Sequence, residues 1–104
     1  MQLTAAVYEF ISKFPSSEQF GLTNQLRRAS VSVASNIAEG YGRSTTGEYV
    51  QFLGMARGSN CEVQTQLEIS EQLDLGRQEE RSVANSLSEE VSRMLVSMMK
   101  KLRE

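Results

Sequence analysis

Residues Leu22 to Glu39 read LTNQLRRASVSVASNIAE, and this stretch decides the fold. Its apolar side chains recur at steps of four, three, four and four residues, the spacing that keeps one face of an α-helix apolar. The stripe consists of Leu22, Leu26, Ala29, Val33 and Ile37. We predict a helix that begins at Leu22 or Thr23 and ends at Glu39, with Gly40 as the left-handed residue just beyond its C-terminus.

Towards the N-terminus, a second apolar pattern predicts a helix from Leu3 to Phe14. Pro15 ends this helix, because Pro has no N–H for the helical ladder and the residue before it avoids the α conformation. Residues 16–21 then form a short connection that has room for one helical turn.

Towards the C-terminus, Thr45 and Glu48 form a capping box that opens a third helix. We predict that this helix runs from Thr46 to about Leu75 and that Gly76 closes it. A fourth helix from Gln78 to Leu102 carries apolar residues in near-heptad steps, with acidic residues at its start and basic residues at its end, as the helix dipole favours.

Four amphipathic segments with short connections and no alternating strand pattern predict an all-α fold, an antiparallel up-down four-helix bundle. A length of 104 residues suits one domain that covers residues 1–104.

Composition narrows the function. The net charge of −2 excludes a polycation that coats nucleic acid, although it permits a local basic patch. The chain has no His, the usual general base and zinc ligand, and no arrangement of nucleophile and base, so we expect no enzyme activity, no metal and no cofactor. The single Cys, Cys61, fits a reducing compartment and a buried or interfacial position. Without a signal peptide or an apolar run of 18 residues, the prediction is a cytoplasmic protein that does not enter a membrane.

Some apolar residues lie off the core stripes of the second and third helices. They are Val31, Ala34, Ala38, Met55, Ile69 and Leu73. Their alignment on two helices predicts an interface between subunits, and the alternative is ordinary apolar surface. Gly54 and Gly58 lie one turn apart in a helix interior, where close packing of a neighbouring helix explains such a pair.

Several polar residues have a functional interpretation as well as a structural one. Arg28 and Glu39 share one helix face with small Ser residues. Arg28 therefore either meets a phosphate or the carboxylate of a partner, or it and Glu39 form ion pairs within or between subunits. Asn36 and Asn60 border or enter apolar stripes, where a hydrogen-bonded amide fixes packing register. Arg43 follows Gly40 and Gly42 in a loop that suits either an anion or a plain turn tied by Arg43.

The pieces QLRRA at 25–29, SNIAEG at 35–40, Gly42-Arg43 and EVQTQL at 62–67 together resemble the four-helix-bundle family of ribosomal RNA intervening-sequence proteins. The resemblance extends over nearly the whole chain, and it implies a ring-shaped homopentamer. Members are encoded within insertions of bacterial large-subunit ribosomal RNA genes. The family is similar to the accessory variability determinant of diversity-generating retroelements, which binds nucleic acid and a reverse transcriptase through a basic surface.

Two functions stay open. One is a non-enzymatic homo-oligomeric scaffold that contacts RNA or DNA, and its basic side chains would be Arg27, Arg28, Arg43, Lys100, Lys101 and Arg103. The alternative is a protein–protein interaction module that recruits a partner without touching nucleic acid.

Overall fold

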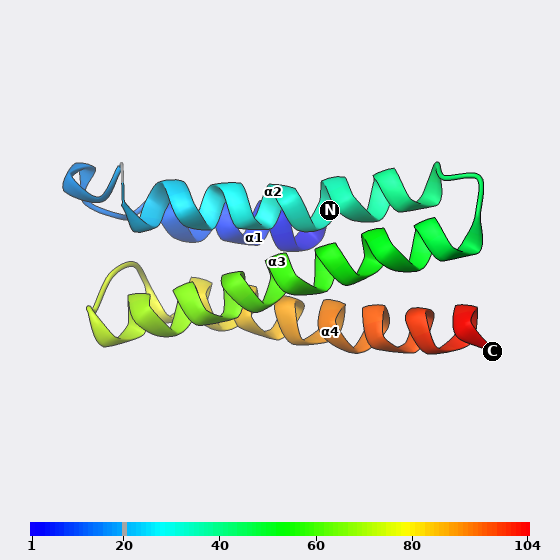
Figure 1. Ribbon diagram of the computed structural model, residues 1–104. Helices are drawn as coiled ribbons and strands as arrows, with labels where there is room; N and C mark the ends of the chain where they lie inside the picture. The colour runs from blue at the N-terminus through cyan, green and yellow to red at the C-terminus, as the bar shows by residue number, and fades with distance from the viewer. Residues whose placement is uncertain (20) are drawn as a thin grey trace.

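The computed structural model describes residues 1–19 and 21–104, and its described part consists of four α-helices and one 3-10 turn (Figure 1). The elements are α1 (Gln2–Ile11), η1 (Ser16–Glu18), α2 (Leu22–Tyr41), α3 (Thr46–Gln72) and α4 (Gln78–Arg103). Consecutive helices are antiparallel, and α1 also packs against α4, so the helices form the predicted up-down four-helix bundle. The molecule measures 44 × 22 × 18 Å. None of the described helices combines the length and the apolar character that a bilayer span requires.

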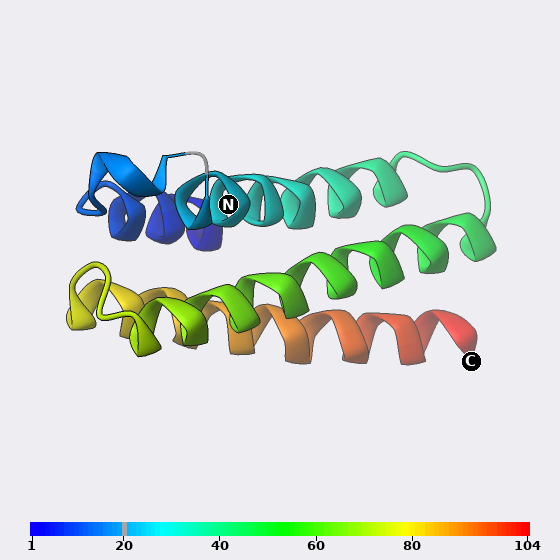
Figure 2. The same ribbon diagram turned by 60° about the vertical axis from the view of Figure 1, so that its left-hand side comes forward.

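α1 covers only one half of the bundle. It has 10 residues, whereas α2 has 20, so it is about 15 Å long beside a helix of about 30 Å. The Thr4 hydroxyl donates to the carbonyl oxygen of Ser30 at 3.3 Å, which places the start of α1 level with the middle of α2. Figure 1 shows the N-terminus beside the middle part of α2, and Figure 2 shows the four helices turned by 60°, so the end of α2 nearest Tyr41 has no α1 beside it.

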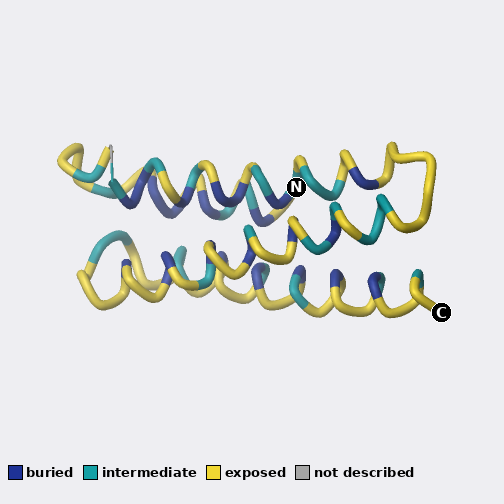
Figure 3. Tube along the Cα trace, viewed as in Figure 1, coloured by how far each residue is buried: buried dark blue, intermediate teal, exposed yellow. Residues whose placement is uncertain are grey.

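The core lies along the inward faces of all four helices (Figure 3). Phe10, Leu26, Leu53 and Leu95 are among its largest fully buried side chains. Each of these residues belongs to one of the four apolar patterns from which the helices were predicted. Burial of the four apolar faces against one another is the main favourable term in folding.

The structure corrects the prediction for Gly40. This residue is not left-handed beyond the helix; it lies inside α2, is buried, and the helix continues to Tyr41. A Cβ at Gly40 would lie 2.9 Å from Phe52 Cβ and 3.0 Å from Tyr49 Cδ1 of α3. Gly40 is therefore required for the close approach of two helices, and not for its backbone conformation.

The ends of α1 and α3 also differ from the predictions. α1 ends at Ile11 because the chain tightens before Pro15 into bonds of the i to i−3 type, such as Phe14 N–H to the Ile11 carbonyl at 3.0 Å. α3 ends at Gln72 in a Schellman motif. In this motif Asp74 has a φ of 56°, and the Leu75 N–H donates to the Ser70 carbonyl at 2.9 Å.

The turn between α3 and α4 packs against α1. Gly76, with a φ of 73°, lies against the rings of Phe10 and Phe14, which meet edge to face with their centroids 4.9 Å apart. A side chain at Gly76 would overlap the Phe10 ring, so this turn needs glycine both for its backbone and for its contact with α1.

Candidate functional site

Three of the predicted basic residues lie on the last turn of α4, and the packing of α3 adds a fourth. Lys100 and Arg103 line a cleft of about 350 Å³ together with Arg57 of α3, the apolar side chains of Val96 and Met99, and the acidic Glu104. Lys101 is exposed on the same turn. We call Arg57, Lys100 and Arg103 the basic cluster. Among the described residues, no acidic side chain forms an ion pair with any of the three.

Arg57 is not among the basic residues predicted from the sequence. It lies 43 residues before Lys100 along the chain, and only the antiparallel packing of α3 on α4 brings the two together. The signal that could have found it is its place four residues after the core residue Leu53, on the edge of the stripe.

Arg43 lies at the same end of the bundle as the basic cluster, but its guanidinium already contacts other side chains of the same protomer. Its guanidinium contacts the Glu39 carboxylate at 3.2 Å and the Glu48 carboxylate at 4.0 Å. It also stacks over the Phe52 ring, 4.6 Å from the centroid. The loop is a turn that Arg43 ties to both α2 and α3, as in the structural reading of the sequence.

Arg27 and Arg28 are far from the basic cluster and face different neighbours. Arg27 lies over the Tyr8 ring of α1, 5.9 Å from its centroid. Arg28 lines a polar cleft between α2 and α3. Glu39 pairs with Arg43 and not with Arg28, so the ion pair expected between Arg28 and Glu39 does not form in the protomer. The six predicted basic residues therefore do not form one continuous surface.

The polar cleft between α2 and α3 has a volume of about 530 Å³ and small side chains along its floor. The hydroxyls of Ser32 and Ser59 share a hydrogen bond of 2.9 Å across the two helices, and the Asn36 amide donates to the Ser32 carbonyl at 2.9 Å. Asn36 is thus bonded within its own helix. Gln66 donates to Gln25 Oε1 at 3.4 Å, and its own Oε1 is buried without a hydrogen-bond partner among the described residues.

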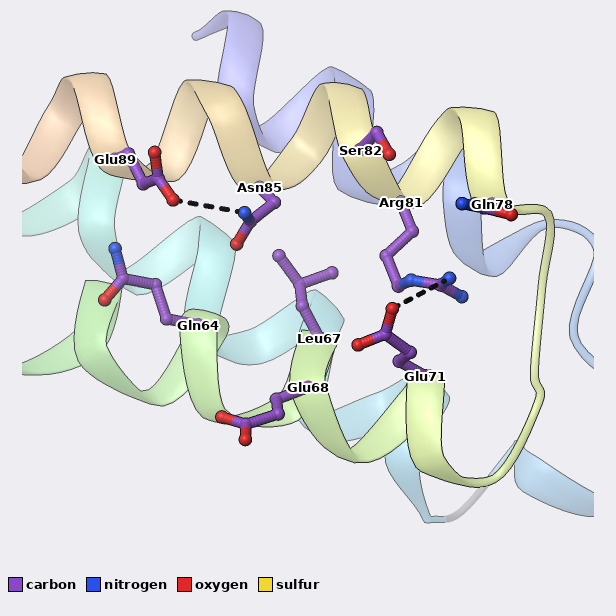
Figure 4. A pocket seen from close by; sticks show the side chains of 9 residues that line it. All are labelled: Gln64, Leu67, Glu68, Glu71, Gln78, Arg81, Ser82, Asn85 and Glu89. Carbon is purple, nitrogen blue, oxygen red and sulfur yellow. Dashed lines mark hydrogen bonds and ion pairs between the residues drawn. The ribbon is translucent and has the colours of Figure 1, made fainter.

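A second cleft, of about 480 Å³, lies between α3 and α4 near the turn that joins them, and its charged rim is mostly acidic (Figure 4). Glu71 pairs with Arg81 at 3.4 Å, and Asn85 donates to Glu89 at 3.2 Å. Among the described residues, no basic side chain pairs with Glu68 or Glu89. We call Glu68, Glu71 and Glu89 the acidic cluster.

Asn60 and Cys61 are neighbours in sequence with opposite environments. Asn60 is 1% exposed; it donates to the Ser88 carbonyl at 2.8 Å and accepts from the Ser88 hydroxyl at 2.8 Å. Cys61 is exposed on α3, so of the two expected positions burial within the protomer is wrong, and an interfacial position stays a prediction. One helical step of 100° separates the core from the surface here.

The apolar residues predicted to form a subunit interface lie in two separate patches. Val31, Ala34 and Ala38, the α2 patch, follow Arg27 at spacings of four, seven and eleven and so lie on the α1 side of α2. Met55, Ile69 and Leu73 form the α3 patch. Met55 and Ile69 are seven residues before and after Glu62, so they share its face of α3. Glu62 lines the polar cleft between α2 and α3, which lies on the side of α2 away from α1. All but the half-buried Ala34 are exposed.

Comparisons with known proteins agree with this fold. The family model of the 23S rRNA-intervening sequence protein matches residues 1–97. Among curated proteins, none matches the chain. The chain is 20% identical in sequence to a protein of unknown function from the S23 ribosomal protein family of Bacteroides thetaiotaomicron, whose crystal structure is known. It superposes with a TM-score of 0.84 over 95% of this chain and 93% of that chain. Because the family model matches nearly the full length, the chain belongs to the 23S rRNA-intervening sequence protein family.

Proposed function

We propose that the protein is a non-enzymatic, homo-oligomeric scaffold that assembles as a closed ring, with five copies as the resemblance implies, in the cytoplasm. The observation that supports this proposal is the pair of apolar patches on different sides of the bundle. The first residue of α1 lies near the start of the α2 patch. Beyond that point no described helix of the same protomer packs over Ala34 and Ala38.

Two different patches that face in different directions suit a heterologous contact, in which the α2 patch of one copy meets the α3 patch of the next. Repeating such a contact generates a ring when the rotation closes, whereas a two-fold dimer uses one patch against itself. The row of Arg28, Ser35 and Glu39 separates the two patches on the surface of α2.

The test is the solution mass, measured by sedimentation in high salt so that surface charges are screened. A ring of five has a mass five times that of the 11.6 kDa protomer. We expect Ala34→Asp and Ile69→Asp each to abolish the ring, whereas Ser97→Asp on the exposed outer face of α4 leaves it intact. An equimolar mixture of the two patch variants should form dimers through the one intact α2 patch and the one intact α3 patch. A wild-type protomer mass at all concentrations would contradict the proposal.

Contact with nucleic acid is the second part of the proposed function, and the basic cluster favours it. Three basic side chains and the one acidic side chain of Glu104 line the cleft, so basic groups outnumber acidic ones there and attract a phosphate backbone. A ring repeats the cluster in every copy. In filter-binding titrations with ribosomal RNA and with DNA, Lys100→Ala with Arg103→Ala should lower the slope of log K against log salt by about one per lost contact and per copy engaged. Arg77→Ala, at the other end of α4, is the matched control. No retention at low salt would exclude this part and leave a protein-interaction module.

A further inference from the structure

We propose that a groove between α1 and α4 binds an amphipathic helix of a partner protein, and that this helix brings a lysine or arginine to one end of the groove. The groove lies on the side of α1 away from α2. Thr4 and Tyr8 of α1 contact α2. Ala5 and Ala6 instead line the groove together with α4. The groove is therefore separate from the α2 patch, and the proposal rests neither on the ring nor on contact with nucleic acid.

The groove has two walls with small side chains and a volume of about 630 Å³. Its small residues are Ala5 and Ala6 of α1 and Ser82 and Ser86 of α4. Small side chains on both walls allow a third helix to approach closely, so that its larger side chains fill the space between α1 and α4. The shape of the groove therefore suits a helix.

Apolar surface in the groove is left uncovered by the protomer. Val83 is 55% exposed, and Leu87, one turn later on α4, is half-buried beside it. On α1 the lining extends from Gln2 to Glu9, which is about 10 Å along the helix axis. Two turns of a bound helix span this length. A helix meets such a groove with apolar residues at spacings of three and four.

A smaller pocket of about 190 Å³ continues the groove and shares two lining residues with it. The carboxylate side chains of Glu9, Glu79 and Glu80 line this pocket, and we call these three residues the glutamate pocket. Lys13 contacts the Glu9 carboxylate at 3.6 Å and the Glu80 carboxylate at 3.8 Å. Three negative charges and one positive charge leave a net charge of −2 at this end of the groove.

The negative charge of the glutamate pocket is only partly balanced. Neither Lys13 nor Arg77, two residues before Glu79, forms an ion pair with Glu79 in the described part of the chain. Glu80 Oε1 is buried and accepts no hydrogen bond from a described residue, which is unfavourable for a carboxylate oxygen. A lysine or arginine suits this place, because its alkyl chain packs on apolar walls while its charged end meets carboxylates.

The other end of the groove is close to neutral. Glu90 lies four residues after Ser86 and Arg93 lies seven residues after it, so two opposite charges share that face of α4. The cation of the partner helix is therefore expected at the glutamate pocket alone, which gives the bound helix a direction. The same negative charge repels phosphates, so nucleic acid is not the occupant of this groove.

Two short helical peptides serve as probes of the groove. Both carry leucines at spacings of three and four, and one has lysines where the other has glutamates. In fluorescence anisotropy with the full-length protein, the lysine peptide should bind, and the glutamate peptide should bind at least about tenfold more weakly. The proposal is overturned if both peptides bind equally well, or if the lysine peptide does not bind at concentrations up to about 1 mM.

Neutral substitutions on both walls locate the bound peptide. Val83→Asn removes apolar surface from the α4 wall, and Ala5→Gln fills the α1 wall with a larger side chain. Both positions are exposed, so both variants should fold, which circular dichroism checks. Each should bind the lysine peptide at least about fivefold more weakly. Val96→Asn, at an exposed valine outside the groove, is the matched control, and wild-type affinity in Val83→Asn and Ala5→Gln would contradict the proposal.

Charge reversal tests the role of the glutamate pocket. Glu9→Lys with Glu79→Lys leaves Glu80 as one negative charge against three positive charges, so the net charge there changes from −2 to +2. This variant should prefer the glutamate peptide. Glu68→Lys with Glu89→Lys makes the same change in the acidic cluster and should keep the wild-type preference. A charge-reversed glutamate pocket that still prefers the lysine peptide would sink the assignment.

A second copy of the chain is the competing occupant, and sedimentation without peptide distinguishes it from a partner helix. Wild type and Val83→Asn should have the same mass over a range of protein concentrations. This expectation holds whether or not rings form, because the groove is separate from the α2 patch. A lower mass for Val83→Asn would show that copies of the chain meet at the groove, and that result would overturn the proposal.

Discussion

Asn60 of α3 and Ser88 of α4 exchange two hydrogen bonds of 2.8 Å in the middle of the core. The amide of Asn60 donates to the Ser88 carbonyl, and the Ser88 hydroxyl donates to Asn60 Oδ1. Both residues are buried, so each satisfies the polar groups of the other, and the pair sets the register of the two longest helices.

Removing one partner of this pair should destabilise the bundle more than removing both. Asn60→Ala leaves the Ser88 hydroxyl buried without its acceptor and opens a cavity, so we expect a loss of about 2–3 kcal/mol in the free energy of unfolding. Asn60→Leu combined with Ser88→Ala replaces the pair by apolar groups and should recover part of this loss. Urea denaturation measures both, with the exposed Asn85→Ala as control. Equal losses in the single and the double variant would contradict the reciprocal bonding.

Gly40 should be intolerant of the smallest side chain. In Gly40→Ala the new Cβ would approach Phe52 Cβ to 2.9 Å and the Tyr49 carbonyl oxygen to 3.3 Å, so α2 and α3 must separate. We expect a loss of about 1–3 kcal/mol in the free energy of unfolding, although alanine is the better helix former. Gly47→Ala is the matched control, because a Cβ there meets nothing within 4 Å, and it should stabilise by up to about 1 kcal/mol. A stable Gly40→Ala variant would show that the two helices are not in close contact there.

Substitutions at the two left-handed residues of the turn between α3 and α4 should have different effects on the free energy of unfolding. Gly76→Ala adds a side chain where φ is 73° and where the Phe10 and Phe14 rings already fill the space. We expect a loss of about 2 kcal/mol or more. Asp74→Gly removes the strain of a φ of 56° and should be neutral or stabilising by up to about 1 kcal/mol. Thermal unfolding followed by circular dichroism checks both, and a lower melting temperature for Asp74→Gly would contradict the left-handed assignment.

Arg43 should act through its flat guanidinium as well as through its charge. Arg43→Lys keeps the positive charge beside Glu39 and Glu48 but cannot stack in the same way on the Phe52 ring. We expect a loss of about 0.5–1 kcal/mol that persists in high salt, because screening weakens the ion pairs and leaves the stacking. Urea denaturation in low and high salt measures it. A loss that vanishes in high salt would show that charge alone explains the role of Arg43.

The sequence alone determined the number, order and direction of the helices, because apolar periodicity, Pro15 and the Thr45 cap are local signals that each segment carries itself. It also predicted α4 to within one residue, since the charges at both of its ends match the helix dipole. Only the tertiary structure decided what each glycine and each charge does. Gly40 is set by the approach of α3, Arg57 joins Lys100 through antiparallel packing, and Cys61 is exposed one step after the buried Asn60. These properties depend on which segments pack together in the folded protein. The residues around each position in the sequence do not indicate which distant segment that is.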